Sequence, residues 1–395
     1  MKIDDKTSHN SPSIRFPEFT GEWKEERLSE IADIYKGAGI SKDQLSDNGE
    51  PCILYGELYT KYKTETITEV ISRTDIDNTK LVRSKANDVI IPCSGETAED
   101  IATARCVIKD GILLGGDLNI IRLHNYDGSF VSYQLNGKRK YDIAKVAQGV
   151  SVVHLYGEHL KGVKTVNPCL AEQKKISRFL SLLDERIAVQ NRLIEDLKKL
   201  RCAIVEKMFK QSKANGRLGD FIEQVSVRNK NGLYSNVLSV SNKQGFVKQS
   251  EQFEDRTVAS EDTSNYKIVK RNNFAYNPAR INVGSIARLT KFDVGIVSPM
   301  YVCFRTKASI IPEYMEAFFT SQQFFYEMMK RLEGSVRLCL SYEGLCNIPV
   351  YIPDMNKQIA MGQNISLILS KIGLEIEYLG RLHQQKQYLL RKMFI

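Results

Sequence analysis

Apolar residues recur in alternating steps of four and three along two long stretches of the chain. The first stretch runs through Ile176, Leu180, Leu183, Ile187, Gln190, Ile194, Leu197, Arg201, Ile204 and Met208. The second runs, position for position, through Met361, Ile365, Ile368, Ile372, Glu375, Leu379, Leu382, Lys386, Leu389 and Met393. Eight of the ten positions are apolar in each stretch, and the polar interruptions fall at the same two places. This spacing predicts two long helices, each carrying the apolar seam of a coiled coil.

The offset that separates Ile176 from Met361 also relates the sequences around the two helices. The matching pairs are Gly149 and Gly334, Leu155 and Leu340, Leu160 and Leu345, Pro168 and Pro353, Gln173 and Gln358, and the Lys-Met-Phe triplets at 207–209 and 392–394. A constant offset over such a length indicates an internal repeat.

Each predicted helix follows a mixed segment that contains short β-rich runs. The strand candidates are 52–55, 88–91, 112–114 and 119–123 in the first segment and 237–240, 274–276 and 300–304 in the second. The two segments match only faintly, as 85–90 does with 270–275. We therefore predict an α+β protein built as a pseudo-two-fold repeat. Its predicted parts are a disordered N-terminus (1–13), a first globular domain (14–167), a central helix (168–211), a second globular domain (212–352) and a C-terminal helix (353–395).

The partner of each apolar seam stays open at this point. A seam from 176 to 208 extends about 50 Å along a helix, and one such helix cannot bury it alone. The two helices could pair with each other, each could pair with another chain, or like helices of two chains could pair. The helices could also be ordinary core helices of a larger fold. An antiparallel pair within the chain would place the two globular domains at opposite ends.

The composition weakly favours an anionic partner and argues against a metal site, disulfides and a membrane span. The net charge is +9, which is compatible with nucleic acid as a partner. The eight cysteines include no Cys-x-x-Cys pair, and with five histidines no metal-ligand spacing is formed. We expect free thiols in a reducing cytoplasm, no bound metal, no secretory signal and no membrane span.

Motifs for catalysis are missing from the sequence. No phosphate-binding loop is present, and Gly37-Ala38-Gly39 lacks the third glycine of a dinucleotide loop. The run 277–280 begins like the adenine-binding motif of amino-methyltransferases, but Ala279 and Arg280 occupy its last two positions, so no aromatic ring can stack on a target base. The sequence therefore predicts a chain that is not an enzyme and binds no cofactor itself.

Basic and aromatic residues offer candidates for DNA contact, because Lys and Arg neutralise phosphates and Arg, Lys and Asn bond to base edges. In the first domain they are Lys36, Lys42, Tyr59, Lys61, Tyr62, Lys63, Arg73, Arg83, Lys85 and Arg105. In the second domain they are Arg228, Lys230, Lys243, Arg271, Asn277, Arg280, Arg288 and Arg337. Taken one at a time, each is more often a solvated surface residue.

The repeated junction is similar to that of the specificity (S) subunits of type I restriction-modification enzymes. It consists of Gly149-Val150-Ser151, then Pro168, then Glu172-Gln173 opening a leucine-rich helix. The second copy keeps Gly334, Pro353 and Gln358, whereas Leu369 replaces Asp184 and Lys357 replaces Glu172.

This resemblance implies two target-recognition domains, each binding half of a bipartite site on double-stranded DNA, and an antiparallel coiled coil that sets the gap. It implies partners as well: two methyltransferase (M) subunits that use S-adenosylmethionine to methylate adenine at N6, and up to two restriction (R) subunits that use ATP and Mg. Two other functions stay open. The chain could be a two-headed adaptor that binds proteins, or a silent S subunit that assembles without reading DNA.

Overall fold

Two packed units make up the chain in the computed structural model, which describes residues 11–77, 79–149, 152–210, 213–242, 244–252, 262–335 and 337–395. Unit 1 consists of Met1–Asn191 and Glu377–Ile395, and unit 2 of Arg192–Ile376. Each unit holds one globular domain and a part of each long helix. Most of the N-terminal segment predicted to be disordered, residues 1–10, lies outside the described residues.

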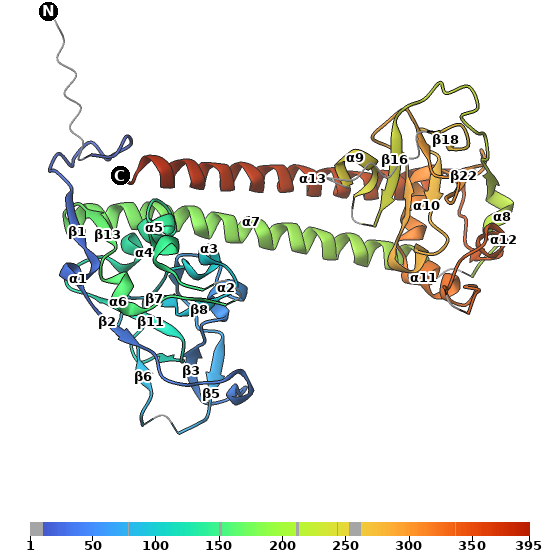
Figure 1. Cartoon of the computed structure of the whole chain (residues 1–395). Helices are drawn as coiled ribbons and strands as arrows, with labels where there is room; N and C mark the ends of the chain where they lie inside the picture. Colours follow the sequence, from blue (N-terminus) through green and yellow to red (C-terminus); the bar gives the residue numbers. More distant parts are fainter. Residues whose placement is uncertain are drawn as a thin grey trace, which may run out of the picture. The chain divides into compact units, whose positions relative to one another are not determined.

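The two predicted long helices are α7 (Leu170–Lys210) and α13 (Met355–Lys392), drawn in green and red in Figure 1. In unit 1, Leu180 near the start of α7 shares a core with Leu389 near the end of α13. In unit 2, Phe209 at the end of α7 shares a core with Ile365 near the start of α13. Within each unit the helices therefore run antiparallel, which answers the pairing question left open by the sequence and confirms the predicted fold class.

Burial follows the apolar seam along both helices. The buried apolar seam residues are Ile176, Leu180, Leu183, Ile187, Ile194, Ile365, Ile372, Leu382, Leu389 and Met393. The half-buried ones are Leu197, Ile204, Met208, Met361, Ile368 and Leu379. The seam thus lies on the inner side of each helix, as expected when one apolar stripe is removed from water.

The domain of unit 1 is built on two sheets. The larger has the strand order β2 (Ala32–Lys36), β11 (Leu118–Leu123), β7 (Asp88–Pro92), β9 (Arg105–Val107) and β4 (Thr66–Ile67). The smaller has the order β5 (Ser72–Thr74), β3 (Glu50–Ile53), β10 (Leu113–Leu114) and β6 (Val82–Arg83). Two short pairs are β1 (Lys24–Arg27) with β13 (Lys164–Asn167) and β8 (Ser94–Gly95) with β12 (Val153–His154). The short helices are α1 (Leu28–Ile31), α2 (Glu57–Thr60), α3 (Ala98–Ile101), α4 (Gly128–Asn136), α5 (Lys140–Val146) and α6 (Gly157–Leu160).

The domain of unit 2 repeats this plan with fewer strands. One sheet has the order β15 (Ile222–Gln224), β22 (Val302–Thr306), β19 (Phe274–Tyr276) and β20 (Ile286–Arg288). The other has the order β17 (Gly245–Lys248), β16 (Val237–Ser241), β21 (Val294–Val297) and β18 (Lys267–Lys270). The strand β14 (Gly216–Arg217) pairs with β23 (Pro349–Val350). The helices are α8 (Leu218–Phe221), α9 (Gln249–Gln252), α10 (Pro312–Phe319), α11 (Gln322–Met329) and α12 (Tyr342–Cys346).

The repeated glutamine near the start of each long helix ties that helix to its domain. The amide of Gln173 donates to the Pro168 carbonyl at 2.8 Å and accepts from the Asp127 backbone at 2.9 Å. Gln358 donates to the Pro353 carbonyl at 2.9 Å and accepts from the backbone of Ile311 at 3.0 Å. Both side chains are buried, so these bonds satisfy polar groups that water cannot reach.

Candidate nucleic-acid interface

One loop in each domain is held by the same backbone hydrogen bonds, and the bonded positions in the two domains correspond to each other in the internal repeat. The Leu155 backbone donates to the Cys93 carbonyl at 2.8 Å, and the Leu340 backbone donates to the Pro278 carbonyl at 3.1 Å. The pairs Gln148–His154 and Glu333–Cys339 each exchange two backbone hydrogen bonds. The two domains therefore share a framework at this place, even though their sequences match only faintly.

A glycine closes each of these loops for a steric reason. Gly149 and Gly334 have φ angles of 124° and 116°, a conformation that side chains rarely adopt. A Cβ atom on Gly334 would lie 2.4 Å from the carbonyl oxygen of Arg337. The repeated glycine is thus required by the shape of the loop.

In unit 2 this loop borders a cleft of about 600 Å³. Three of the predicted DNA-contacting residues, Asn277, Arg280 and Arg337, line it together with Met300 and Tyr301. The sequence alone could not place Arg337 beside Asn277 and Arg280, because it lies far from them along the chain.

Hydrogen bonds to Asn277 hold the turn that carries Arg280. Asn277 accepts from the Ala279 backbone at 3.0 Å through its side chain and from the Arg280 backbone at 3.0 Å through its carbonyl. Both arginine side chains are exposed, and neither makes a hydrogen bond or ion pair with another described residue. The cleft therefore presents two guanidinium groups that the described residues leave without a hydrogen-bond or ion-pair partner.

A cleft that borders the corresponding loop of unit 1 has different lining residues. Its lining includes Lys36, Asp117, Asn119 and His154. Asp117 has a φ of 58°, which is uncommon for any residue other than glycine. The side chain of Asn119 donates to the Leu155 carbonyl at 2.9 Å and so joins the shared framework. The two clefts thus combine a common frame with different side chains.

The other predicted DNA-contacting residues that lie at the surface fall into two groups, those without a partner among the described residues and those with a partner in the protein. Lys42, Lys85 and Lys230 are exposed, and their side chains form no hydrogen bond or ion pair within the described ranges. The second group has partners within the protein. Lys61 forms an ion pair with Glu57, Arg83 with Glu50 and Arg271 with Asp293. Lys63, Arg73 and Tyr59 donate to backbone carbonyls, and Arg228 donates to the side chain of Asn265. Lys243 lies outside the described residues.

Three of the predicted DNA-contacting residues are interior residues. Tyr62 is 6% exposed, and the Arg105 guanidinium donates to its carbonyl at 3.2 Å. Burial lowers the pKa of Arg105. The Arg288 side chain is 10% exposed and pairs with Glu313 and Glu316. Each of these three side chains makes contacts inside its own domain. We therefore exclude them from the candidate DNA surface.

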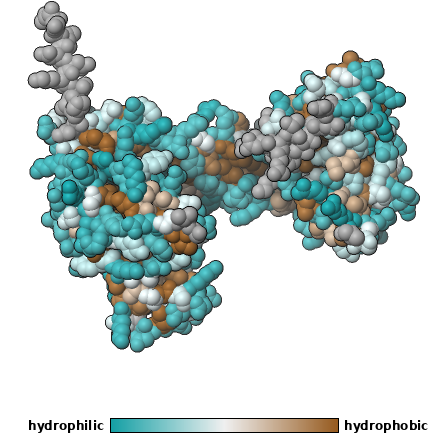
Figure 2. Space-filling model, in the orientation of Figure 1, coloured by the Kyte–Doolittle hydropathy of each residue, from teal (hydrophilic) through white to brown (hydrophobic). Residues whose placement is uncertain are grey.

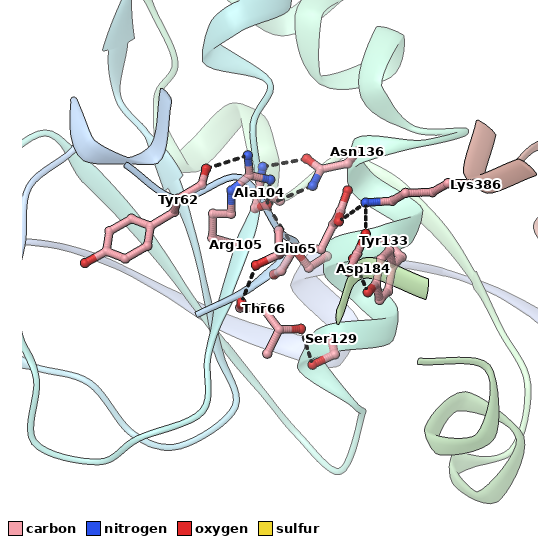
Figure 3. A network of polar contacts seen from close by, with 12 residues as sticks. Tyr62, Glu65, Thr66, Ala104, Arg105, Ser129, Tyr133, Asn136, Asp184 and Lys386 are labelled. Atoms are coloured by element: carbon pink, nitrogen blue, oxygen red, sulfur yellow. Dashed lines mark hydrogen bonds and ion pairs between the residues drawn. The ribbon is translucent and has the colours of Figure 1, made fainter. Parts of the chain in front are cut away.

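One of the polar interruptions of the seam forms a buried network that the sequence did not reveal (Figure 3). Lys386 of α13 lies 2.6 Å from a carboxylate oxygen of Glu65 in the globular domain and 2.6 Å from one of Asp184 in α7. The hydroxyl of Tyr133 donates to the other oxygen of Asp184 at 2.6 Å. The only signal in the sequence was that a polar residue interrupts both seams at the same place.

Shifted pKa values follow from this burial. Desolvation and the nearby Glu65 carboxylate raise the pKa of Asp184 to about 6. Burial alone would raise the pKa of Glu65, but the ammonium group of Lys386 lowers it. Two carboxylates thus share one cation, and they differ in how readily they lose a proton.

The described residues show neither a metal centre nor a membrane helix. No group of three or more His, Cys, Asp or Glu side chains among them is arranged to hold a metal ion. None of their helices is both long and apolar enough to cross a bilayer.

Comparison with known proteins gives a consistent result. Residues 20–199 match the type I restriction modification DNA specificity domain. Over 197 residues the chain is 25% identical to the type I restriction enzyme MjaVIII specificity subunit of Methanocaldococcus jannaschii. That alignment covers 50% of this chain and 43% of the relative, so the chain matches less than half of the relative's length.

Two solved structures share the fold. The S subunit of the type I restriction-modification system from M. genitalium has a TM-score of 0.62 and 18% identity, over 98% of this chain and 99% of that one. A chain from a structure on complex assembly and conformational transition of the type I R-M system has a TM-score of 0.55 and 14% identity, over 94% and 97%. Residues 20–199 of the chain thus resemble the type I restriction modification DNA specificity domain, and over nearly its whole length the chain has the fold of the solved S subunit.

Proposed function

We propose that this chain is the non-catalytic DNA-recognition subunit of a type I restriction-modification complex. Each globular domain binds one half of a bipartite site on double-stranded DNA, and the long helices set the gap between the halves. The observation that carries this proposal is the loop that the same hydrogen bonds hold in both domains, and that borders a cleft with different side chains in each. Such a frame suits two domains that bind the same polymer and distinguish different base sequences.

The unpaired cations support DNA as the polymer. Lys42 and Lys85 in unit 1 and Lys230 in unit 2 are exposed and form no ion pair with the described residues. Cations of this kind can displace counterions from phosphates, which makes DNA binding steeply dependent on salt.

A salt titration therefore tests DNA binding and separates it from the adaptor function. The sample is the complex of this chain with its methyltransferase subunit, and the measurement is its affinity for duplex DNA between about 50 and 200 mM salt. We expect a fall of at least about tenfold, because several phosphate contacts each release a counterion. A nearly flat response would contradict DNA recognition and support the adaptor.

The outer faces of the long helices support docking of partner subunits. Leu182 and Val189 on α7 are 46% and 67% exposed. Leu367 and Leu374, their counterparts in the repeat on α13, are 69% and 62% exposed. Figure 2 shows apolar surface along the helical stretch. An apolar pair that is exposed in both copies of the repeat fits two like partners, and we propose that these are two methyltransferase subunits.

Substitutions on this face test the docking. Val189→Asp and Leu374→Asp are each expected to reduce co-purification with the methyltransferase subunit, because each places a charge in an apolar contact. Ile71→Asp and Leu233→Asp are matched controls, since both residues are exposed and apolar but lie in the globular domains. Equal loss in all four variants, or in none, would contradict docking through the helices.

The remaining parts of the proposal concern components that this chain does not carry. We propose that S-adenosylmethionine binds to the methyltransferase subunits and that ATP and Mg bind to up to two restriction subunits. The complex would act in the cytoplasm, where DNA is present. A silent S subunit is the second candidate, and it predicts assembly without sequence-specific DNA binding.

A further inference from the structure

The cleft of unit 2 contains hydrogen-bonding groups that have no partner in the part of the chain that the structure describes. The guanidinium groups of Arg280 and Arg337 have no partner within the described residues. The side-chain oxygen of Gln249, which also lines the cleft, is buried and has no hydrogen-bond partner among them. A buried polar atom without a partner costs free energy, so this arrangement indicates a ligand with polar edges.

These two arginines differ from other arginines of the same domain. Arg271 pairs with Asp293 at 2.8 Å, Arg305 pairs with Glu223, and Arg288 is held by two glutamates. An arginine in such a pair is already neutralised and oriented by the protein. Arg280 and Arg337 are thus available to a ligand, and the turn that carries Arg280 is held by Asn277.

The equivalent positions of unit 1 lack this feature. The constant offset of the repeat places Gly95 opposite Arg280 and Val152 opposite Arg337. The hydrogen bonds that hold the loops are the same in both units, as shown by the Leu155–Cys93 and Leu340–Pro278 pairs. The two guanidinium groups are therefore specific to unit 2. They contribute to ligand recognition by this unit and not to the loop structure that both units share.

We infer that Arg280 and Arg337 recognise guanine in the half-site bound by unit 2, through the major-groove edge of the base. This inference rests on the proposed function. The planar fork of an arginine matches the O6 and N7 acceptors of guanine, which no other base presents together. Asn277 holds the turn that carries Arg280, so it acts as a positioning residue.

Base analogues test this inference on the complex with the methyltransferase subunit. The probes are duplexes that contain the recognised site, with single guanines replaced by 7-deazaguanine, which lacks N7, or by hypoxanthine, which keeps N7 and O6. For at least one guanine of one half-site, we expect 7-deazaguanine to lower affinity by roughly ten- to a hundredfold and hypoxanthine to change it little.

Variants assign the effect to the cleft. Arg280→Ala and Arg337→Ala are each expected to weaken binding to the natural site and to reduce the sensitivity to 7-deazaguanine, in one half-site only. Arg271→Ala is the matched control, because it removes an exposed arginine that is already paired. It is expected to keep both the affinity and the sensitivity. Arg280→Lys and Arg337→Lys are expected to keep the charge but lose discrimination between bases.

The possible failures are distinct. If the unaltered complex binds no specific sequence, the proposed function fails and this inference fails with it. If specific binding is present but the arginine variants weaken all sequences equally, the arginines contact phosphates and the inference alone is overturned. The same conclusion follows if the half-site affected by the variants contains no guanine.

Discussion

Lys386, near the end of α13, forms an ion pair with Asp184 of α7 at 2.6 Å and a second one with Glu65 at 2.6 Å. The lysine side chain is 14% exposed, and the two carboxylate side chains are 7% and 9% exposed. This contact joins both long helices and the globular domain within unit 1. The last turns of α13 are therefore part of the first domain's structure.

Removal of this cation should destabilise unit 1. Lys386→Met leaves two buried carboxylates without their partner, and we expect unit 1 to lose about 3–5 kcal/mol. Trp23 is the single tryptophan and is 1% exposed in the core of unit 1, so its fluorescence during urea unfolding reports on this unit. Arg381→Met removes an exposed partner of Glu377 on the same helix and should cost under about 1 kcal/mol. Equal effects of the two variants would contradict a stabilising role for the network.

Asp184 should give unit 1 a characteristic pH dependence. Its folded pKa of about 6 lies above the ordinary value of 3.8, so the folded state keeps a proton that the unfolded state releases. The stability from this proton is fully present below about pH 4 and is lost as pH rises through about 6. Glu65, whose pKa is lowered, acts in the opposite direction: its stability is present above its unfolded pKa and is lost as pH falls.

Asp184→Asn isolates this contribution, because asparagine resembles the protonated carboxyl and cannot ionise. Between pH 5 and pH 7 we expect the native protein to lose about 1 kcal/mol through Asp184 and the variant to lose less. The measurement is the urea midpoint from Trp23 fluorescence at both pH values. The idea is wrong if native protein and variant show the same change.

The buried glutamine at the start of α7 should contribute strongly to stability. Gln173→Ala leaves the Pro168 carbonyl and the Asp127 backbone amide without the bonds that the side chain provides. We expect a loss of about 2–4 kcal/mol, since each buried group costs about 1–3 kcal/mol when unsatisfied. Gln384→Ala is the control, because Gln384 is exposed on α13 within unit 1. Similar urea midpoints for the two variants would show that the hydrogen bonds of Gln173 contribute little to the free energy of unfolding.

The length of the helices should set the gap in the recognised DNA. Insertion of one heptad at matched positions in both helices adds about 10 Å, which corresponds to about three base pairs. We expect the methylated motif to keep both half-sites and to gain a longer gap. Altered half-sites with an unchanged gap would rule out the helices as the spacer.

The helical part of the fold was predictable because burial imposes a period on the sequence. An α-helix with one buried side repeats its apolar residues every three to four positions. Leu180 and Leu382, which this period places on the buried side of their helices, are both buried. The repeat added support that was independent of any single position. The role of Gln173 was not predictable, because its partners are set by the tertiary fold.

The candidate DNA surface was less predictable, because charge alone does not reveal pairing. Arg83 bonds to Glu50 across 33 residues, and Arg105 is held inside the domain by backbone carbonyls. Arg280 and Arg337 look the same as these residues in sequence. Only the fold shows that Arg280 and Arg337 are exposed, line one cleft and have no partner among the residues that the structure describes.

Mapping of N6-methyladenine is the most direct test of DNA recognition by this chain. The chain would be co-expressed with the methyltransferase subunit that we propose as its partner, and methylation would be mapped across the host genome. We predict a single bipartite motif with two short, different halves and a fixed gap. An assembled complex that adds no methylation, or methylation without a bipartite motif, would contradict the proposed function.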